Sequence, residues 1–190
     1  MNTIQTRTVA RLALLVATGA MAAGLATGSA RAAGIDIHQD ADAADVGLPL
    51  YPGAVKKPSK EDDGHAGISV GLWGGAFGMK LAAVRYASRD GVDAVSAFYR
   101  DALAKYGPVL DCSQNKPRPK GAASGGMSVD IDSGKGSAPK PVTCGDDGPG
   151  APGGRLYKVG TQADQRIFEA KPVLDGVNFE LVHLQLRGLD

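Results

Sequence analysis

The chain has 190 residues, and its 21 Lys and Arg against 20 Asp and Glu give a formal net charge of +1. This balance argues against a nucleic acid or a membrane surface as partner, because both attract strongly basic proteins. With 27 Gly, 11 Pro and only 5 % aromatic residues, the composition predicts many loops around one small, mostly aliphatic core.

Residues 1–33 predict a secretory signal peptide. Arg7 and Arg11 precede the apolar run LALLVATGAMAAGLA, and small residues at the cleavage positions indicate processing after Ala32 or Ala33. The alternative is an uncleaved anchor helix, for which this run is short and too rich in Gly and Ala. Removal of this segment leaves 18 basic and 20 acidic residues, a net charge of −2. We therefore expect an exported protein, periplasmic or secreted, with no stable membrane span after cleavage.

Residues 34–46 are predicted to form an acidic flexible arm, because they contain several acids and few large apolar side chains. His38 stands among Asp36, Asp40 and Asp42, a set that could hold a metal loosely. A solvated acidic segment is the favoured interpretation, since no rigid spacing fixes these ligands.

A single domain is predicted to span residues 47–190. Its first segment, 48–54 (LPLYPGA), places two prolines around apolar residues, which indicates an extended chain at a domain edge. Asp62, Asp63 and His65 follow in a turn-like stretch. A metal site at these three residues is the alternative to an ordinary exposed loop, which we favour.

Two strands, at residues 68–72 and 79–87, are predicted to form a hairpin across a Gly-rich turn. The overlapping stretch GGAFGMK resembles a phosphate-binding loop only superficially, because its spacing departs from G-x-x-x-x-G-K-[ST] and no helix follows it directly. A further short strand is expected at residues 108–112.

Residues 90–107 (DGVDAVSAFYRDALAKYG) predict an amphipathic helix around which the rest of the domain is organised. Apolar residues recur at steps of three and four and share one face, while charged residues occupy most of the other. Asp90 and Asp93 place negative charge at its N-terminus, and Gly107 and Pro108 mark its end. One apolar stripe indicates one packing partner, so the helix is expected to lie across a sheet.

Residues 113–153 are predicted to form a low-complexity loop, rich in Gly, Pro, Ser and Lys and too poor in apolar residues to bury itself. Residues 130–134 (DIDSG) resemble the start of a calcium loop, but the later acidic ligands are missing. Cys112 and Cys144 are the only cysteines, and in an exported protein they predict a disulfide that closes this loop. A redox or metal-binding thiol pair is the alternative, which their wide separation disfavours.

The remaining strands are predicted at residues 155–159, 166–171 and 177–187, the last two forming a hairpin. The last strand is apolar on both faces in its middle, which predicts a central place in the sheet. His183 lies in this strand, and we interpret it as a semi-buried strand residue rather than a catalyst. No Ser or Cys nucleophile shows a partner in the sequence.

Several segments together resemble one family, and they are 48–54 (LPLYPGA), 78–88, 97–107 (AFYRDALAKYG) with 109–112, and 159–188. They are similar to a group of uncharacterised exported bacterial proteins with a Y-P-G-A segment and an F-Y-R-x-x-L helix. The likeness covers most of residues 47–188 apart from the low-complexity loop. It implies a common fold and export, and it supplies no activity and no functional residues.

The sequence predicts an α+β fold, with one amphipathic helix packed on an antiparallel sheet of about five strands, in the order β-β-α-β-loop-β-β-β. For function, we expect a non-enzymatic module, without cofactor, that binds an envelope protein, a peptide or another envelope component. One alternative is a metal-dependent or hydrolytic enzyme using His65 or His183 with nearby acids. Another is a structural factor of the envelope. The sequence predicts no catalytic, cofactor-binding or metal-binding residue.

Overall fold

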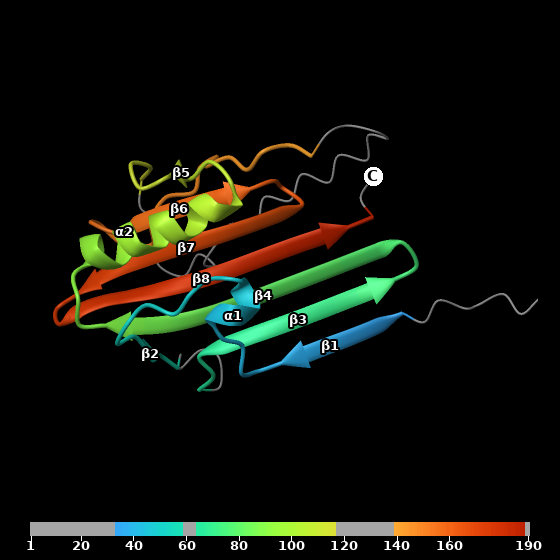
Figure 1. The fold of residues 1–190 in the computed structure, drawn as a ribbon, viewed down its shortest axis with the longest axis horizontal. Coiled ribbons are helices and arrows are strands. Elements are labelled where there is room, and N and C mark those ends of the chain that lie inside the picture. Colours follow the sequence, from blue (N-terminus) through green and yellow to red (C-terminus); the bar gives the residue numbers. More distant parts are fainter. Residues whose placement is uncertain (1–32, 59–63, 117–138, 189–190) are drawn as a thin grey trace, which may run out of the picture. The chain divides into compact units, whose positions relative to one another are not determined.

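The computed structural model describes residues 33–58, 64–116 and 139–188, and these form a large antiparallel sheet with helices on one face (Figure 1). The elements in chain order are β1 (Gly34–His38), α1 (Ala43–Val46), β2 (Val55–Lys56), β3 (Gly67–Gly74), β4 (Phe77–Ser88), α2 (Val92–Leu103), the 3-10 turn η1 (Ala104–Tyr106), β5 (Leu110–Asp111), β6 (Arg155–Gly160), β7 (Asp164–Val173) and β8 (Gly176–Arg187).

The sheet has eight strands, and seven of them follow the order β1-β3-β4-β8-β7-β6-β5, while β2 pairs with β4. Every pairing is antiparallel. The β3–β4 hairpin turns tightly at Gly75, whose φ of 62° suits glycine. The longest pairing joins β4 to β8, from Gly78 opposite Arg187 to Ser88 opposite Val177. The predicted central strand, β8, lies between β4 and β7.

The predicted fold, a sheet of about five strands, is wrong in its size and its strand order. Chain residues before position 67 contribute β1, α1 and β2, none of which the prediction contained. In β1 the apolar Ile35 and Ile37 alternate with polar residues, but the acidic segment around them obscured this short period-two pattern. Residues 34–46, predicted as an acidic flexible arm, thus contain an edge strand and a short helix.

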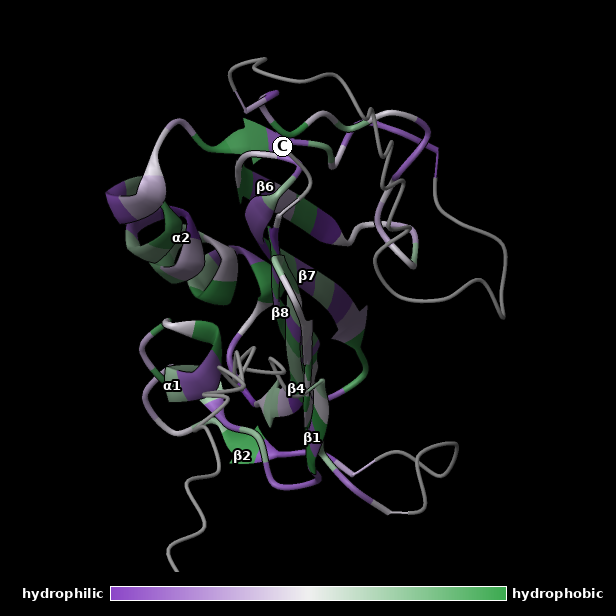
Figure 2. Ribbon diagram, turned by 90° about the vertical axis from the view of Figure 1, so that its right-hand side faces the viewer, coloured by the Kyte–Doolittle hydropathy of each residue, from purple (hydrophilic) through white to green (hydrophobic). Residues whose placement is uncertain are grey.

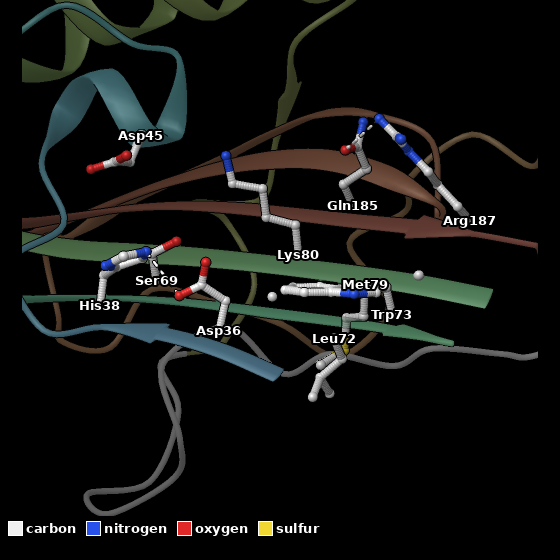
Figure 3. A pocket seen from close by; sticks show the side chains of 12 residues that line it. Asp36, His38, Asp45, Ser69, Leu72, Trp73, Met79, Lys80, Gln185 and Arg187 are labelled. Carbon is white, nitrogen blue, oxygen red and sulfur yellow. Dashed lines mark hydrogen bonds and ion pairs between the residues drawn. The ribbon is translucent and has the colours of Figure 1, made fainter. Parts of the chain in front are cut away.

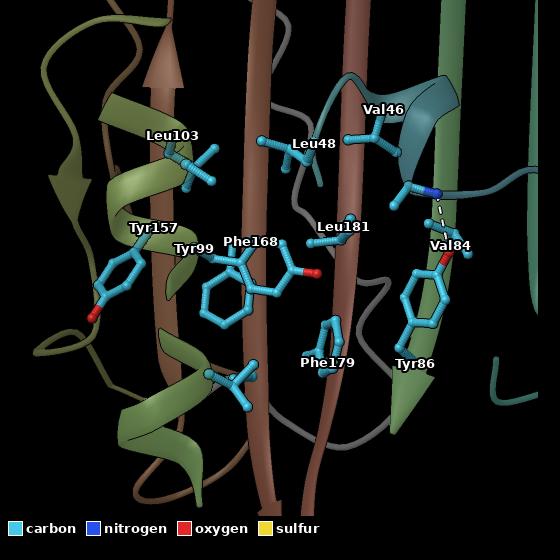
Figure 4. Close-up of a cluster of buried hydrophobic side chains, with 14 of the residues drawn as sticks. Val46, Leu48, Val84, Tyr86, Tyr99, Leu103, Tyr157, Phe168, Phe179 and Leu181 are labelled. Carbon is cyan, nitrogen blue, oxygen red and sulfur yellow. Dashed lines mark hydrogen bonds between the residues drawn. The ribbon is translucent and has the colours of Figure 1, made fainter. Parts of the chain in front are cut away.

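Both helices lie on one face of the sheet, which we call the helix face (Figure 2). Helix α2 contributes Val95, Tyr99 and Leu103, each fully buried. The Tyr99 ring stacks on Phe168 at 4.8 Å between ring centroids and contacts Phe179 at 5.3 Å (Figure 4). The main core is therefore aromatic at its centre, although aromatic residues are scarce in the chain.

The 48–54 segment packs beside α2. The backbone N–H of Tyr51 donates to the hydroxyl of Tyr99 at 3.2 Å, and the Tyr51 hydroxyl donates to Asp90 at 2.7 Å. The Tyr51 ring meets Phe98 edge-on at 5.2 Å. These contacts explain why an extended Pro-bracketed segment stays against the domain.

The opposite side of the sheet, which we call the loop face, has a second and smaller core. A disulfide joins Cys112 to Cys144, as predicted from the sequence, and it packs near Leu156 and Ile167. Lys158 is buried, and its Nζ lies 2.5 Å from Asp147 Oδ2. These contacts fix the described part of the 113–153 loop on the sheet.

Among the described residues, no helix is both long and apolar enough to cross a membrane.

Candidate functional site

A groove of about 450 Å³ lies beside α1 on the helix face, and we call it the open-face groove (Figure 3). It is lined by Asp36, His38, Asp45, Ser69, Gly71, Leu72, Trp73, Gly78, Met79, Lys80, Gln185 and Arg187. The sheet register explains the groove, because small residues occupy neighbouring positions on β3 and β4. Ser69 faces Ala82 in β4, and Gly71 faces Lys80. The floor is therefore mostly backbone.

Trp73 is the only tryptophan of the chain, and it forms one wall of the groove. Gly34 and Gly78 stand opposite it on the two neighbouring strands. A Cβ on Gly34 would lie 2.4 Å from Cε2 of the indole, and one on Gly71 would lie 3.3 Å from Cζ3. The ring thus lies directly against the backbone of β1 at Gly34, where glycine alone leaves room for it, and lies close over Gly71 of β3.

The indole remains open to solvent, since Trp73 is 48 % exposed. One face of the indole packs on the glycine backbone, which fixes the orientation of the ring, and the other face is exposed to solvent. We call this arrangement the Trp73 platform.

Polar side chains of both charge signs surround the Trp73 platform. Asp36 pairs with His38 at 2.9 Å on β1, and Lys80 rises from β4 (Figure 3). On β8, an Arg187 Nη2 donates to the Gln185 side chain at 3.4 Å. The groove therefore offers hydrogen-bond donors and acceptors within reach of one apolar ring.

A second polar group adjoins the groove at Gln185, and we call it the Asp164 cluster. His183 Nε2 lies 2.9 Å from one oxygen of Asp164, and Arg166 donates to the same oxygen at 3.4 Å. Gln185 donates to the other oxygen at 3.3 Å. The carboxylate of Asp164 thus has three side-chain partners from β7 and β8.

Arg166 connects this cluster to the helices. Its Nε donates to the Val46 carbonyl at 3.1 Å, and its guanidinium lies 3.7 Å from the centroid of the Tyr106 ring. The Tyr106 hydroxyl donates to the Gly47 carbonyl. A cation over an aromatic face is attractive, so Arg166 fixes the end of α1 beside the groove.

Burial lowers the pKa of His183, although the hydrogen bond to Asp164 acts in the opposite direction. The residue is only 7 % exposed. The buried imidazole therefore supports the Asp164 carboxylate and leaves little of its own ring for a ligand.

The other candidates from the sequence stay apart. His65 lies in the turn before β3, whereas His183 pairs with Ala82 farther along the sheet, so the structure does not bring the two histidines together. His38 and Asp36 form a pair, but no group of three or more metal-ligating side chains occurs among the described residues. Asp62, Asp63 and residues 130–134 lie outside the described part of the chain.

Sequence reasoning missed Trp73. The signal was nevertheless present, because the single tryptophan of the chain lies in a strand with Gly71 and Gly74 nearby and Gly78 just beyond the turn. From the sequence alone, Gly74 and Gly78 are interpreted as turn residues and Gly71 as part of a strand. Their second role, as space for the indole, depends on the strand register.

A second hollow, of about 1150 Å³, lies near the β7–β8 turn, and no aromatic side chain lines it.

Comparisons with protein-family models, with curated proteins and with solved structures find no match to this chain. The candidate site therefore rests on geometry alone, and the open-face groove is the better-built of the two hollows.

Proposed function

We propose that the protein is an exported, non-enzymatic binding module that holds a glycan of the cell envelope in the open-face groove. The observation that carries the proposal is the Trp73 platform, a half-exposed indole seated on glycine backbone within a polar groove. An exposed aromatic ring offers a flat apolar surface of fixed orientation. Binding sites typically combine such surfaces with a few placed polar groups.

A sugar ring matches this combination. One face of a pyranose presents C–H groups that stack on an indole, and its rim presents hydroxyl groups that both donate and accept hydrogen bonds. Around the platform, Asp36 accepts, Lys80 and Arg187 donate, and Gln185 does both. Because the rim carries both charge signs, it suits a hydroxyl-rich ligand better than a ligand of one strong charge.

Export is part of the proposal. Residues 1–33 have the layout of a secretory signal, and the Cys112–Cys144 disulfide is typical of proteins that fold in an oxidising compartment. An exported module of this kind would fold in the same compartment that contains the glycans of the cell envelope.

The test uses the fluorescence of the single tryptophan. Adding N-acetylglucosamine oligomers or soluble peptidoglycan fragments to the exported protein is expected to shift and saturably change the Trp73 emission. A Gly34→Val variant places a side chain where the indole lies, so it should weaken binding by up to about tenfold, the loss of one stacked contact. Gly91→Ala is the matched control, because a Cβ there meets nothing within 4 Å.

The proposal fails if no glycan of either type changes the emission, or if Gly34→Val and Gly91→Ala bind equally. Cleavage of the oligomer during the titration, abolished by His183→Gln, would instead assign a hydrolytic role to the Asp164 cluster.

A further inference from the structure

The strand β1 ends the sheet and, within the described residues, has no strand on its outer side. Edge strands are usually protected from pairing with other chains by charged side chains, above all Lys, by Pro, by a bulge, by a covering segment or by their short length. The sequence of β1, GIDIH, has no Lys and no Pro, and it pairs with β3 without a bulge. Its two isoleucines are 70 % and 59 % exposed. Apart from the Asp36–His38 pair and its short length, this edge has none of these protections among the described residues, and it is therefore open for pairing.

We propose that two copies of this chain pair through β1 in antiparallel orientation, with a two-fold axis at Asp36. This register uses the whole strand. It places Ile35 of each copy opposite Ile37 of the second copy, twice, on the loop face. A two-fold interface needs a surface that complements itself, and the isoleucine pairs of β1 meet this requirement on the loop face.

On the helix face, the same register places His38 opposite Gly34 of the second copy. The indole of Trp73 lies over that glycine, so each imidazole comes to the margin of the second copy's open-face groove. The two grooves then adjoin across the new strand pair, and His38 of one copy completes the edge of the other groove.

The register also sets a limit on affinity. The two Asp36 side chains face each other, and like charges directly opposite each other in a strand pair are destabilising. Each carboxylate has its own His38 at 2.9 Å, which reduces the repulsion. A five-residue strand pair is also small beside ordinary stable interfaces. The dimer is therefore weak and depends on protein concentration.

Sedimentation of the exported protein over a wide concentration range provides the first test. The wild-type chain is expected to self-associate reversibly, and Ile37→Lys should abolish association. Leu174→Lys is the control, because Leu174 is fully exposed at the β7–β8 turn, away from β1. Loss of association in the control but not in Ile37→Lys would overturn the proposal.

The second test locates the two-fold axis. A labelled Asp36→Lys chain is titrated with itself and with the wild-type chain, and anisotropy reports binding. Because position 36 faces itself, the mixed pair joins Lys to Asp, so it should be about tenfold tighter than the pair of variants. Asp36→Asn should tighten the homodimer.

Equal affinities in the two titrations would refute this register. A wild-type chain that stays monomeric at every concentration would overturn the dimer and leave the edge to a strand from a different protein. Both readouts are independent of any glycan, so they can fail while the proposed function stands.

Discussion

Removing the side chain of Tyr99 should produce one of the largest losses of stability available in this domain. The residue is fully buried, and its ring contacts Phe168, Phe179 and Phe98 at centroid distances of 4.8, 5.3 and 5.1 Å. Tyr99→Ala leaves a cavity at the junction of α2 with β7 and β8. Losses of about 3–5 kcal/mol are typical for a large aromatic truncated in a packed core.

Tyr99→Phe separates the ring from its hydroxyl. The hydroxyl accepts one hydrogen bond, from the Tyr51 backbone at 3.2 Å. Losing this bond costs about 0.5–1.5 kcal/mol, because the donor is only partly buried and water can replace the acceptor. Most of the Tyr99→Ala effect must therefore come from packing.

Arg100→Ala is the matched control, one residue along the same helix. Its guanidinium reaches Asp111 at 3.3 Å and lies 5.2 Å from the Tyr157 ring centroid, but its side chain is 56 % exposed. Such exposed pairs contribute about 1 kcal/mol or less. Urea denaturation followed by circular dichroism gives all three free energies of unfolding. If Tyr99→Ala lost no more stability than Arg100→Ala, α2 would not hold the main core together.

Three further predictions concern pH and the disulfide. Burial lowers the pKa of His183, so as the pH falls the unfolded chain protonates this imidazole before the folded chain does. The contribution of the neutral imidazole to folding stability is therefore present above about pH 6.5 and is lost as the pH falls below that value. Acid titration of stability should therefore be flatter in His183→Gln than in the wild type, and identical slopes would contradict this. Burial raises the pKa of Tyr99, so its contribution is present below about pH 10 and lost as pH rises further; Tyr99→Phe should reduce the alkaline loss, as alkaline denaturation midpoints would show. The Cys112–Cys144 bridge spans 32 positions, so Cys112→Ser with Cys144→Ser should cost about 3–4 kcal/mol on the chain-entropy model, and an unchanged urea midpoint would count against it.

Strong local periodicity made some elements predictable. The stripe that includes Val95, Tyr99 and Leu103 located α2 within residues 90–107, and all three side chains are buried. The two cysteines had only each other as partners, so their number together with the expected export predicted the bridge. The helix depends on residues that are close in sequence, and the disulfide depends on there being only one possible pairing of two cysteines.

Weak or long-range signals explain the errors. The first strand is five residues long inside an acidic segment, and only its pairing with β3 reveals it as part of the sheet. The fold prediction therefore had too few strands and the wrong order. Because a sheet of this kind is assembled from distant segments, composition and periodicity cannot fix which strands are neighbours.

The candidate site could not be predicted from the sequence for the same reason. The open-face groove combines side chains from β1, β3, β4, β8 and α1. Trp73 becomes a platform only because Gly34 arrives beside it from a segment almost forty positions earlier. Neither residue indicates a site until the strand register is known.

The proposed function requires a glycan to stack on Trp73 in the open-face groove. The most direct measurement is an NMR titration of the ¹⁵N-labelled protein with N-acetylglucosamine oligomers. Chemical-shift changes are expected to concentrate at the Trp73 indole N–H and at the backbone amides of Gly71 and Gly78, while the amide shifts of Cys112 and Leu156 on the loop face stay unchanged. Shifts confined to the loop face, or no shift at saturating oligomer, would contradict it.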